Sequence, residues 1–185
     1  MVFNIKIINI FLIFSPKLNT NLVKFWWMTN SIIVIVSYTC PPNNTLYNNL
    51  CYGPGPNNGN RDFDRAISDC YGDGQGNLTK LDHPTKMAIA TTNLATNRQY
   101  WIGLKDIYHQ NNASGFRWII DDSVASGFSK WAPSQPGGSL EDCVYIKYYD
   151  DDWYWYTQEC DENARVLCQR SNLTLIFKFL SKFIE

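Results

Sequence analysis

The sequence has no excess of charge of either sign. Its 16 lysines and arginines nearly balance its 17 aspartates and glutamates, which leaves a net charge of −1 at pH 7. Proteins that bind nucleic acid or an anionic membrane surface through charge present an excess of lysine and arginine. The composition therefore argues against a nucleic-acid partner.

Motifs of the common enzyme and metal classes are also missing. The chain contains no Gly-x-Ser-x-Gly, no phosphate-binding loop and no His-Glu-x-x-His. It has no Cys-x-x-Cys pair, and its two histidines, His83 and His109, are far in sequence from the cysteines, so zinc-finger spacing is absent. We interpret both histidines as capping or surface residues, because no nucleophile or second metal ligand accompanies either of them. We predict that the protein is not an enzyme.

What the chain does contain is an even set of six cysteines: Cys40, Cys51, Cys70, Cys143, Cys160 and Cys168. Such sets form disulfides in oxidising compartments, and spacing alone leaves their pairing open. Four asparagines begin glycosylation sequons, namely Asn43, Asn77, Asn112 and Asn172. Both features predict a secreted, extracellular glycoprotein.

The amino end resembles an export signal. Lys6 precedes an apolar run over residues 7–14, which is typical of a signal-peptide core and too short to span a bilayer. A second apolar patch follows, and small residues precede Cys40, where cleavage is conceivable. We interpret 1–39 as a signal peptide or hydrophobic leader. The alternatives are a retained anchor, which alone would bring a membrane partner, and a true start at Met28.

The rest of the chain has room for one domain with short extensions. Apolar residues at three- and four-residue steps predict a helix over 62–71. Pro84 suits the first turn of a second helix over 84–95, which Asp82 or His83 can cap. The tail, 171–185, is apolar at mixed spacing and is either an amphipathic helix or a non-native extension.

The region between and after these helices predicts short strands. Alternating and aromatic runs indicate strands at 101–104, 116–120, 143–148, 153–156 and 165–168, and a hairpin at 40–51. Residues 121–138 show little regular pattern, and we expect Phe128 and Trp131 to pack this long loop down. The sequence therefore predicts an α+β domain at 40–170.

Four motifs in this region resemble those of the long-form C-type lectin-like domain. They are Phe63-x-x-Ala66-x-x-x-Cys70, Trp101-Ile102-Gly103-Leu104, Trp131 followed by Gln135-Pro136 and Glu141-Asp142-Cys143, and Arg165-Val166-Leu167-Cys168. The resemblance implies two helices and short antiparallel strands with a long loop, stapled by three disulfides. The implied pairs are Cys40–Cys51, Cys70–Cys168 and Cys143–Cys160.

The resemblance also implies where a calcium ion would bind. Family members use the first and third residues of a Glu-Pro-Asn or Gln-Pro-Asp triplet, a Glu before Asp-Cys, and an Asn-Asp pair after a Trp. This chain keeps Gln135, Glu141 and the cis-proline position Pro136. Gly137 offers no side-chain oxygen.

Two further ligand positions are lost, because Tyr156 and Thr157 replace the Asn-Asp pair. Calcium takes about six to eight oxygen ligands. We therefore expect the usual calcium site to be degraded and name no cofactor, with Ca²⁺ possible but its ligand set incomplete. Residues 150–152 are three consecutive aspartates, which we interpret as a solvated turn because consecutive side chains in a strand point to opposite faces.

The tyrosines after Trp153 suggest how a ligand could bind without the metal. If Trp155 is buried, Tyr154 and Tyr156 share the other strand face, which we interpret as the ligand side. A sugar ring could stack on Tyr156 with help from Gln135 and Glu141, although ordinary packing is the alternative.

The candidate ligand-binding residues are therefore Gln135, Glu141, Tyr154, Tyr156 and Thr157. We predict an extracellular module that binds a glycan weakly or without calcium. The alternative is the same fold used to recognise an extracellular protein.

Overall fold

The computed structural model describes residues 11–13, 20–26, 31–38, 40–56, 59–72, 76–110, 112–171 and 173–180. The chain divides into two compact units, which are described separately. The terminal unit comprises Met1–Thr39 and Asn172–Glu185, and the large unit comprises Cys40–Ser171.

The terminal unit contains a four-stranded antiparallel sheet in the order β1-β2-β3-β13. Its strands are β1 (Phe11–Ile13), β2 (Thr20–Trp26), β3 (Ser31–Tyr38) and β13 (Leu173–Leu180). Strand β13 pairs with β3 along its whole length, from Leu173 opposite Tyr38 to Leu180 opposite Ser31. The tail therefore forms a strand and not the helix that was one of its two interpretations. Cleavage before Cys40 stays a prediction.

The large unit contains two helices, α1 (Phe63–Gly72) and α2 (Pro84–Thr91), with strands between and after them. The strands are β4 (Thr45–Tyr47), β5 (Leu50–Pro54), β6 (Asn77–Leu78), β7 (Gln99–Asp106), β8 (Phe116–Trp118), β9 (Ser123–Val124), β10 (Cys143–Tyr149), β11 (Asp152–Gln158) and β12 (Arg165–Arg170). The predicted α+β class is confirmed.

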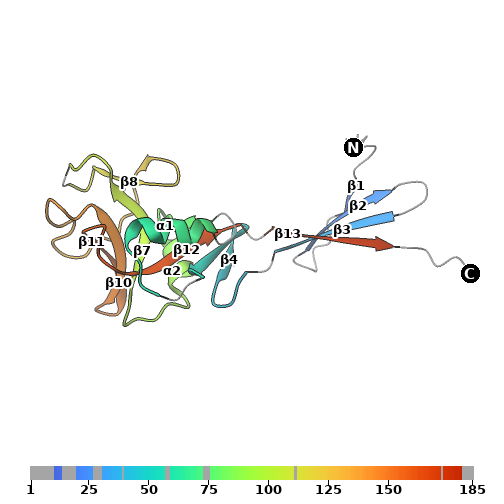
Figure 1. Cartoon of the computed structure of the whole chain (residues 1–185), viewed down its shortest axis with the longest axis horizontal. Helices are drawn as coiled ribbons and strands as arrows, with labels where there is room; N and C mark the ends of the chain where they lie inside the picture. The colour runs from blue at the N-terminus through green and yellow to red at the C-terminus, as the bar shows by residue number, and fades with distance from the viewer. Residues whose placement is uncertain are drawn as a thin grey trace, which may run out of the picture. The chain divides into compact units, whose positions relative to one another are not determined.

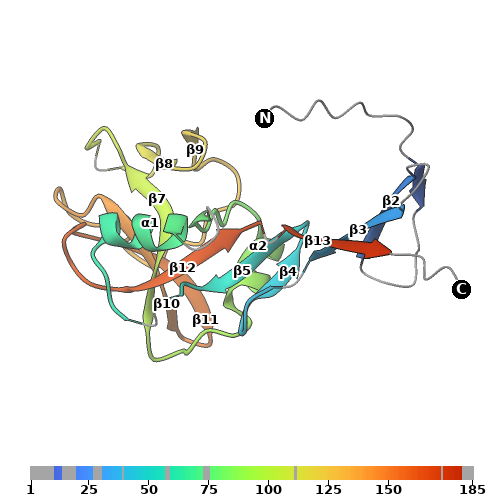
Figure 2. The same ribbon diagram turned by 45° about the vertical axis from the view of Figure 1, so that its right-hand side comes forward.

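One sheet runs through the large unit in the order β11-β10-β7-β12-β5-β4. Only the β12–β7 pair is parallel, and the short strands β6 and β8 branch from β12 and β7. Helix α1 packs against β12 and β6, while α2 packs against β4 and β5 (Figure 1; Figure 2).

The core lies on both faces of β7, because each face is covered by different elements. Trp101 packs with Phe63 and Cys70 of α1 in one cluster, whereas Ile102 and Leu104 belong to a second, larger cluster. A strand covered on both faces carries a continuous apolar run, which explains why this segment does not alternate with polar residues.

The three disulfides join the pairs that the family resemblance implies: Cys40–Cys51, Cys70–Cys168 and Cys143–Cys160. Cys70–Cys168 fixes α1 to β12 across a sequence separation of 98 residues. In a chain-entropy treatment, closing a loop of this length removes roughly 4–5 kcal/mol of unfolded-state entropy. The long bridge therefore gives the fold a large part of its stability.

Several element boundaries differ from the sequence predictions. Helix α2 ends at Thr91 and not at residue 95, because the Leu94 side chain is buried and the Ala95 N–H donates to the Tyr100 hydroxyl at 3.0 Å. At its other end, His83 is the cap, its Nδ1 accepting from the Thr85 N–H at 3.1 Å.

Strand β8 ends at Trp118 and not at residue 120. The N–H groups of Asp121 and Asp122 both donate to the Trp118 carbonyl, at 3.3 and 2.8 Å, and so close a turn there. The short strand β9 lies inside the loop that the sequence predicted as irregular.

Gly103 is placed where two strands approach too closely for a side chain. Its N–H donates to the Thr79 carbonyl at 3.0 Å, and a Cβ on it would lie 2.8 Å from the Leu78 carbonyl oxygen. Leu78 is itself paired with Cys168 of β12, so its backbone has little freedom to move. A glycine at this position therefore lets β6 lie against β7.

We expect Gly103→Ala to lower the free energy of unfolding by about 1–3 kcal/mol, because the added methyl group must displace backbone atoms. Thermal or urea denaturation without reductant measures this effect. Gly72→Ala is the matched control, since no atom lies within 4 Å of a Cβ at that exposed helix end. The control should change stability by less than about 1 kcal/mol and can raise it. Equal losses in both variants would contradict the explanation.

Candidate functional site

The long loop is held against β11 by the side chain and backbone of Trp155. The Trp155 ring meets three aromatic rings edge-on, those of Trp118, Phe128 and Trp131, at centroid distances of 5.7, 6.0 and 5.5 Å. The backbone N–H of Trp155 donates to the Lys130 carbonyl at 2.7 Å, and the backbone carbonyl of Trp155 accepts from the Ala132 N–H at 3.0 Å. The loop is therefore packed down, as the sequence predicted from Phe128 and Trp131.

This docking brings Gln135, Glu141 and Thr157 together. The Thr157 N–H donates to Gln135 Oε1 at 2.7 Å, and Thr157 Oγ1 lies 2.6 Å from Glu141 Oε2. The Gly137 N–H donates to the same hydroxyl at 2.7 Å. Thr157 is only 5% exposed, and the Gln135–Pro136 peptide bond beside it is cis.

The Thr157 hydroxyl has one proton and two possible acceptors within hydrogen-bond distance. Oγ1 lies 2.8 Å from Gln135 Oε1 and 2.6 Å from Glu141 Oε2. The carboxylate is the stronger acceptor because it is charged, and Gln135 Oε1 already accepts from the Thr157 N–H. We therefore assign the proton to Glu141. The threonine hydroxyl thus accepts from Gly137, donates to Glu141 and links the loop to the strand.

Gly137 makes this arrangement possible. A Cβ at this position would overlap Glu141 Oε2 and lie 2.9 Å from Thr157 Oγ1. A side chain at 137 is therefore incompatible with the present position of the Glu141 carboxylate. The glycine that removes a calcium ligand also opens the space into which Glu141 folds.

The oxygen atoms gathered here do not match the shell that calcium takes. Gln135, Glu141 and Thr157 offer one carboxylate between them, and their contacts satisfy one another, whereas calcium prefers about six to eight oxygens with balancing charge. Within residues 40–56, 59–72, 76–110 and 112–171, no group of three or more His, Cys, Asp or Glu side chains is placed to hold a metal ion.

The predicted tyrosines lie on the other face of β11. Trp153, Trp155 and Thr157 are buried, while Tyr154 and Tyr156 are half-buried at the alternate positions. The Tyr156 ring stacks on Tyr145, its partner on β10, with centroids 5.4 Å apart and planes 13° apart. Within the described part of the chain, no hydrogen bond joins Tyr156 to Gln135 or Glu141. The five predicted ligand-binding residues thus form two groups.

Tyr145 was not among the residues predicted from the sequence, and it lies beside Tyr156 on the outer face of β10 and β11. Burial raises its pKa, with further contributions from Tyr156 and from the negative charge of Glu141. The pKa of Tyr156 is raised too, first by burial and then by Tyr149 and Tyr154. Both phenols therefore remain neutral hydrogen-bond donors at neutral pH. The alternating pattern of β10 indicates that Tyr145 faces away from the buried residues Val144 and Ile146. That its neighbour is Tyr156 follows only from the register of β10 and β11.

Tyr154 belongs to a separate charged contact. Lys130 Nζ lies 5.1 Å from the Tyr154 ring centroid and donates to Asp152 Oδ2 at 2.6 Å. This hydrogen bond lowers the pKa of Asp152 and raises the pKa of Lys130. Asp150 and Asp151 are exposed, with φ of 48° and 61°, so they form the tight hairpin turn and are not positioned as ligands.

The remaining predicted residues lie on the surface or outside the described chain. Asn43, Asn77 and Asn112 are exposed, as a glycosylation acceptor must be, and Asn172 lies outside the described residues. His109 is exposed, as predicted for a surface residue, and its Nδ1 lies 2.7 Å from Asp142 Oδ2.

Comparison with known proteins agrees with this architecture. The family model described as the lectin C-type domain matches residues 59–170. The mouse protein named C-type lectin domain family 4 member G is 29% identical over 109 residues, which cover 58% of this chain and 35% of that protein. The chain therefore spans well under half the length of this curated relative.

Solved structures with the same fold include two described as lectins. One is the C-type lectin domain of murine dendritic cell inhibitory receptor 2 in complex with an N-glycan, with 24% identity and a TM-score of 0.63, covering 72% of this chain and 100% of that one. Another is a Ca²⁺-independent C-type lectin from Saxidomus purpuratus, with 21% identity and a TM-score of 0.55, covering 71% and 94%. Likenesses at this identity establish the fold, and the predicted fold is confirmed.

We expect Thr157→Val to destabilise the protein by about 1–3 kcal/mol, because the Glu141 carboxylate and the Gly137 N–H both lose a partner. Thermal denaturation followed by circular dichroism measures the change. Thr85→Val is the control, since Thr85 is exposed at the start of α2. Its effect should stay within about 0.5 kcal/mol, as for most surface substitutions. A Thr157→Val variant as stable as the wild type would show that the hydroxyl does not hold the loop.

Proposed function

The chain belongs to the C-type lectin family, and we propose that its large unit is an extracellular module that binds glycans weakly and without calcium. The observation that carries the proposal is the Thr157 hydroxyl, which lies between Gln135 and Glu141 where the family resemblance places a cation. Thr157 pairs with both residues without a metal ion, so in this proposal a ligand binds through side chains alone.

The comparisons support a glycan as the ligand class. The murine receptor domain was solved with an N-glycan, and the Saxidomus purpuratus protein is described as Ca²⁺-independent. A C-type lectin fold is thus compatible with both parts of the proposal. Fold alone leaves the ligand open, however, since one scaffold serves many functions.

The site retains polar groups that suit sugar hydroxyls. Within the described part of the chain, Gln135 Nε2 and Glu141 Oε1 take part in no hydrogen bond, which leaves one donor and one acceptor beside Thr157. A sugar hydroxyl can both donate and accept, so two hydroxyls would pair with these groups. A bond to the neutral amide contributes about 0.5–1.5 kcal/mol and one to the charged carboxylate about 1.5–3 kcal/mol, so the two together give dissociation constants on the order of 1 mM or weaker.

The outer face of β10 and β11 supports a second candidate, recognition of an extracellular protein. Tyr145, Tyr154 and Tyr156 share this face, and Tyr149 beside them is 59% exposed. Tyrosine is enriched in protein interfaces because its ring offers area and its hydroxyl a hydrogen bond. Broad tyrosine surfaces suit a protein as well as a sugar.

The three disulfides and the exposed glycosylation sequons support an extracellular location. Three disulfides persist best in an oxidising compartment, and exposed Asn43, Asn77 and Asn112 are accessible for glycosylation. Among the residues that the structure describes, none of the helices has the length and hydropathy needed to span a membrane. The family consists generally of binding modules, which agrees with a protein that is not an enzyme.

We expect glycan-array binding by the purified protein to be the same in calcium and in EDTA. Glu141→Gln should weaken binding several-fold, because the neutral amide is a poorer acceptor for a sugar hydroxyl. Tyr156→Ala tests whether the tyrosine face takes part. Loss of binding in EDTA would contradict the metal-free proposal. Absence of glycan binding together with capture of one defined extracellular protein would favour the second candidate.

Restoring the missing ligands should create a calcium site. We expect the triple variant Gly137→Asn, Tyr156→Asn, Thr157→Asp to bind Ca²⁺ with a dissociation constant of about 10⁻⁴–10⁻³ M, as in other extracellular modules. Titration calorimetry measures this binding, with the wild type expected to give no signal. The control carries Gly138→Asn in place of Gly137→Asn with the same charge. Equal calcium binding by wild type and triple variant would mean that the native site is intact.

A further inference from the structure

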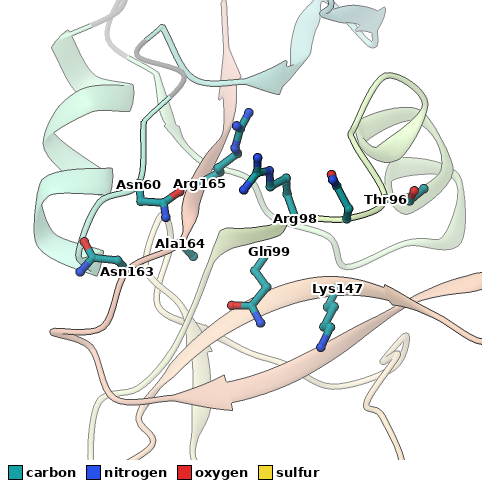
Figure 3. Close-up of a pocket in the computed structure, with 9 residues that line it drawn as sticks. Asn60, Thr96, Arg98, Gln99, Lys147, Asn163, Ala164 and Arg165 are labelled. Atoms are coloured by element: carbon teal, nitrogen blue, oxygen red, sulfur yellow. The ribbon is translucent and has the colours of Figure 1, made fainter.

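A second polar pocket lies at the other end of the strands that carry the lectin site. It has a volume of about 310 Å³ and is lined by groups that include Asn60, Arg98, Gln99, Lys147, Asn163 and Arg165 (Figure 3). Pockets for small ligands begin at about 300 Å³. The hollow therefore has room for a group the size of one sugar unit.

Three neighbouring strands bring these residues together. Lys147 of β10 is the register partner of Gln99 of β7, and Arg165 of β12 is paired with Tyr100, the next residue of β7. Lys147 is three residues beyond Val144, the partner of Thr157, which corresponds to about 10 Å along the strand. The pocket is thus separate from the Gln135–Glu141–Thr157 network.

The pocket gathers positive charge. Arg98, Lys147 and Arg165 line it, and among the described residues that line it there is no aspartate or glutamate. Within the described residues, neither Arg98 nor Lys147 forms an ion pair, whereas other cations of the same unit, such as Lys80, Lys86 and Lys130, each contact a carboxylate. Like charges held close together repel one another, and an anion between them relieves that repulsion.

We propose that this pocket binds the sulfate or phosphate ester of an acidic glycan. A tetrahedral ester presents three outer oxygens, which guanidinium groups suit as charged donors. The Arg98 and Arg165 side chains lie beside each other in the pocket, while Lys147 adds positive charge from beyond Gln99 (Figure 3). The amides of Asn60, Gln99 and Asn163 add neutral donors at the rim. A planar carboxylate has two oxygens and would leave more of these donors without a partner.

The surroundings of Lys147 favour a sugar as the carrier of the ester. Lys147 lies between Tyr145 and Tyr149 on the outer face of β10, and its cross-strand partner is Tyr154. Tyrosine rings beside Lys147 on this strand face provide surfaces on which a sugar ring can stack. The net charge of −1 gives the whole protein no general attraction for nucleic acid.

The test measures binding of a sulfated oligosaccharide, its desulfated form and a hexose 6-phosphate by titration calorimetry. Although the glycan as ligand class rests on the proposed function, the pocket itself does not. The wild type should bind the sulfated form, and Arg98→Gln with Lys147→Gln should weaken that binding at least tenfold. Affinity should also fall as salt is raised. Comparing the sulfate and phosphate arms identifies the preferred ester.

The control is Arg65→Gln with Lys86→Gln, which changes the net charge equally on residues outside the pocket. It should alter binding less than twofold, and denaturation curves should show that both double variants are folded. Equal binding of sulfated and desulfated forms, equal loss in both double variants, no binding by the wild type, or preference for an acidic peptide would each overturn the proposal.

The two proposals fail separately. If Glu141→Gln weakens binding of neutral glycans several-fold while Arg98→Gln with Lys147→Gln leaves binding of the sulfated form unchanged, the lectin site stands and the ester pocket is refuted. If neutral glycans do not bind and sulfated ones bind through Arg98 and Lys147, the ester pocket stands alone.

Discussion

Burial of the Trp155 indole is the constraint on which the recognition site depends. The ring contacts one tryptophan of the sheet and two aromatic residues of the long loop, while its backbone bonds to the loop on both sides. A loop of this length carries little secondary structure of its own. The indole anchors the loop at Phe128 and Trp131, and the hydrogen bonds of Thr157 then hold Gln135 against β11.

In the proposed metal-free site, a hydrogen-bond network lies where the family resemblance implies calcium ligands. Thr157 supplies a hydroxyl that both accepts and donates, and Gly137 leaves the volume into which Glu141 folds. The glycine at 137 and the threonine at 157 are both needed for this arrangement. A side chain at 137 would clash with the carboxylate, and without the hydroxyl the carboxylate would lose a partner.

The hairpin of β10 and β11 has one buried face and one outer face, because its buried and exposed residues alternate. Its inward residues fill the core and end at Thr157, while its outward residues form the tyrosine face that leads to Lys147. Because strand side chains alternate, the two surfaces share a backbone but not side chains. The lectin site and the cationic pocket can therefore change independently.

Local chemistry was sufficient to predict much of this protein. The spacing of Phe63, Ala66 and Cys70 predicts α1, and the family resemblance supplied the disulfide pairs and the loss of calcium ligands at Gly137. The end of α2 could not be predicted, because the hydroxyl that stops it belongs to Tyr100 and reaches it only in the fold. The cationic pocket could not be predicted for the same reason, because its charged residues lie on or next to three strands that are far apart in the chain. Sequence thus determined which groups are present, and tertiary structure alone decided which of them meet.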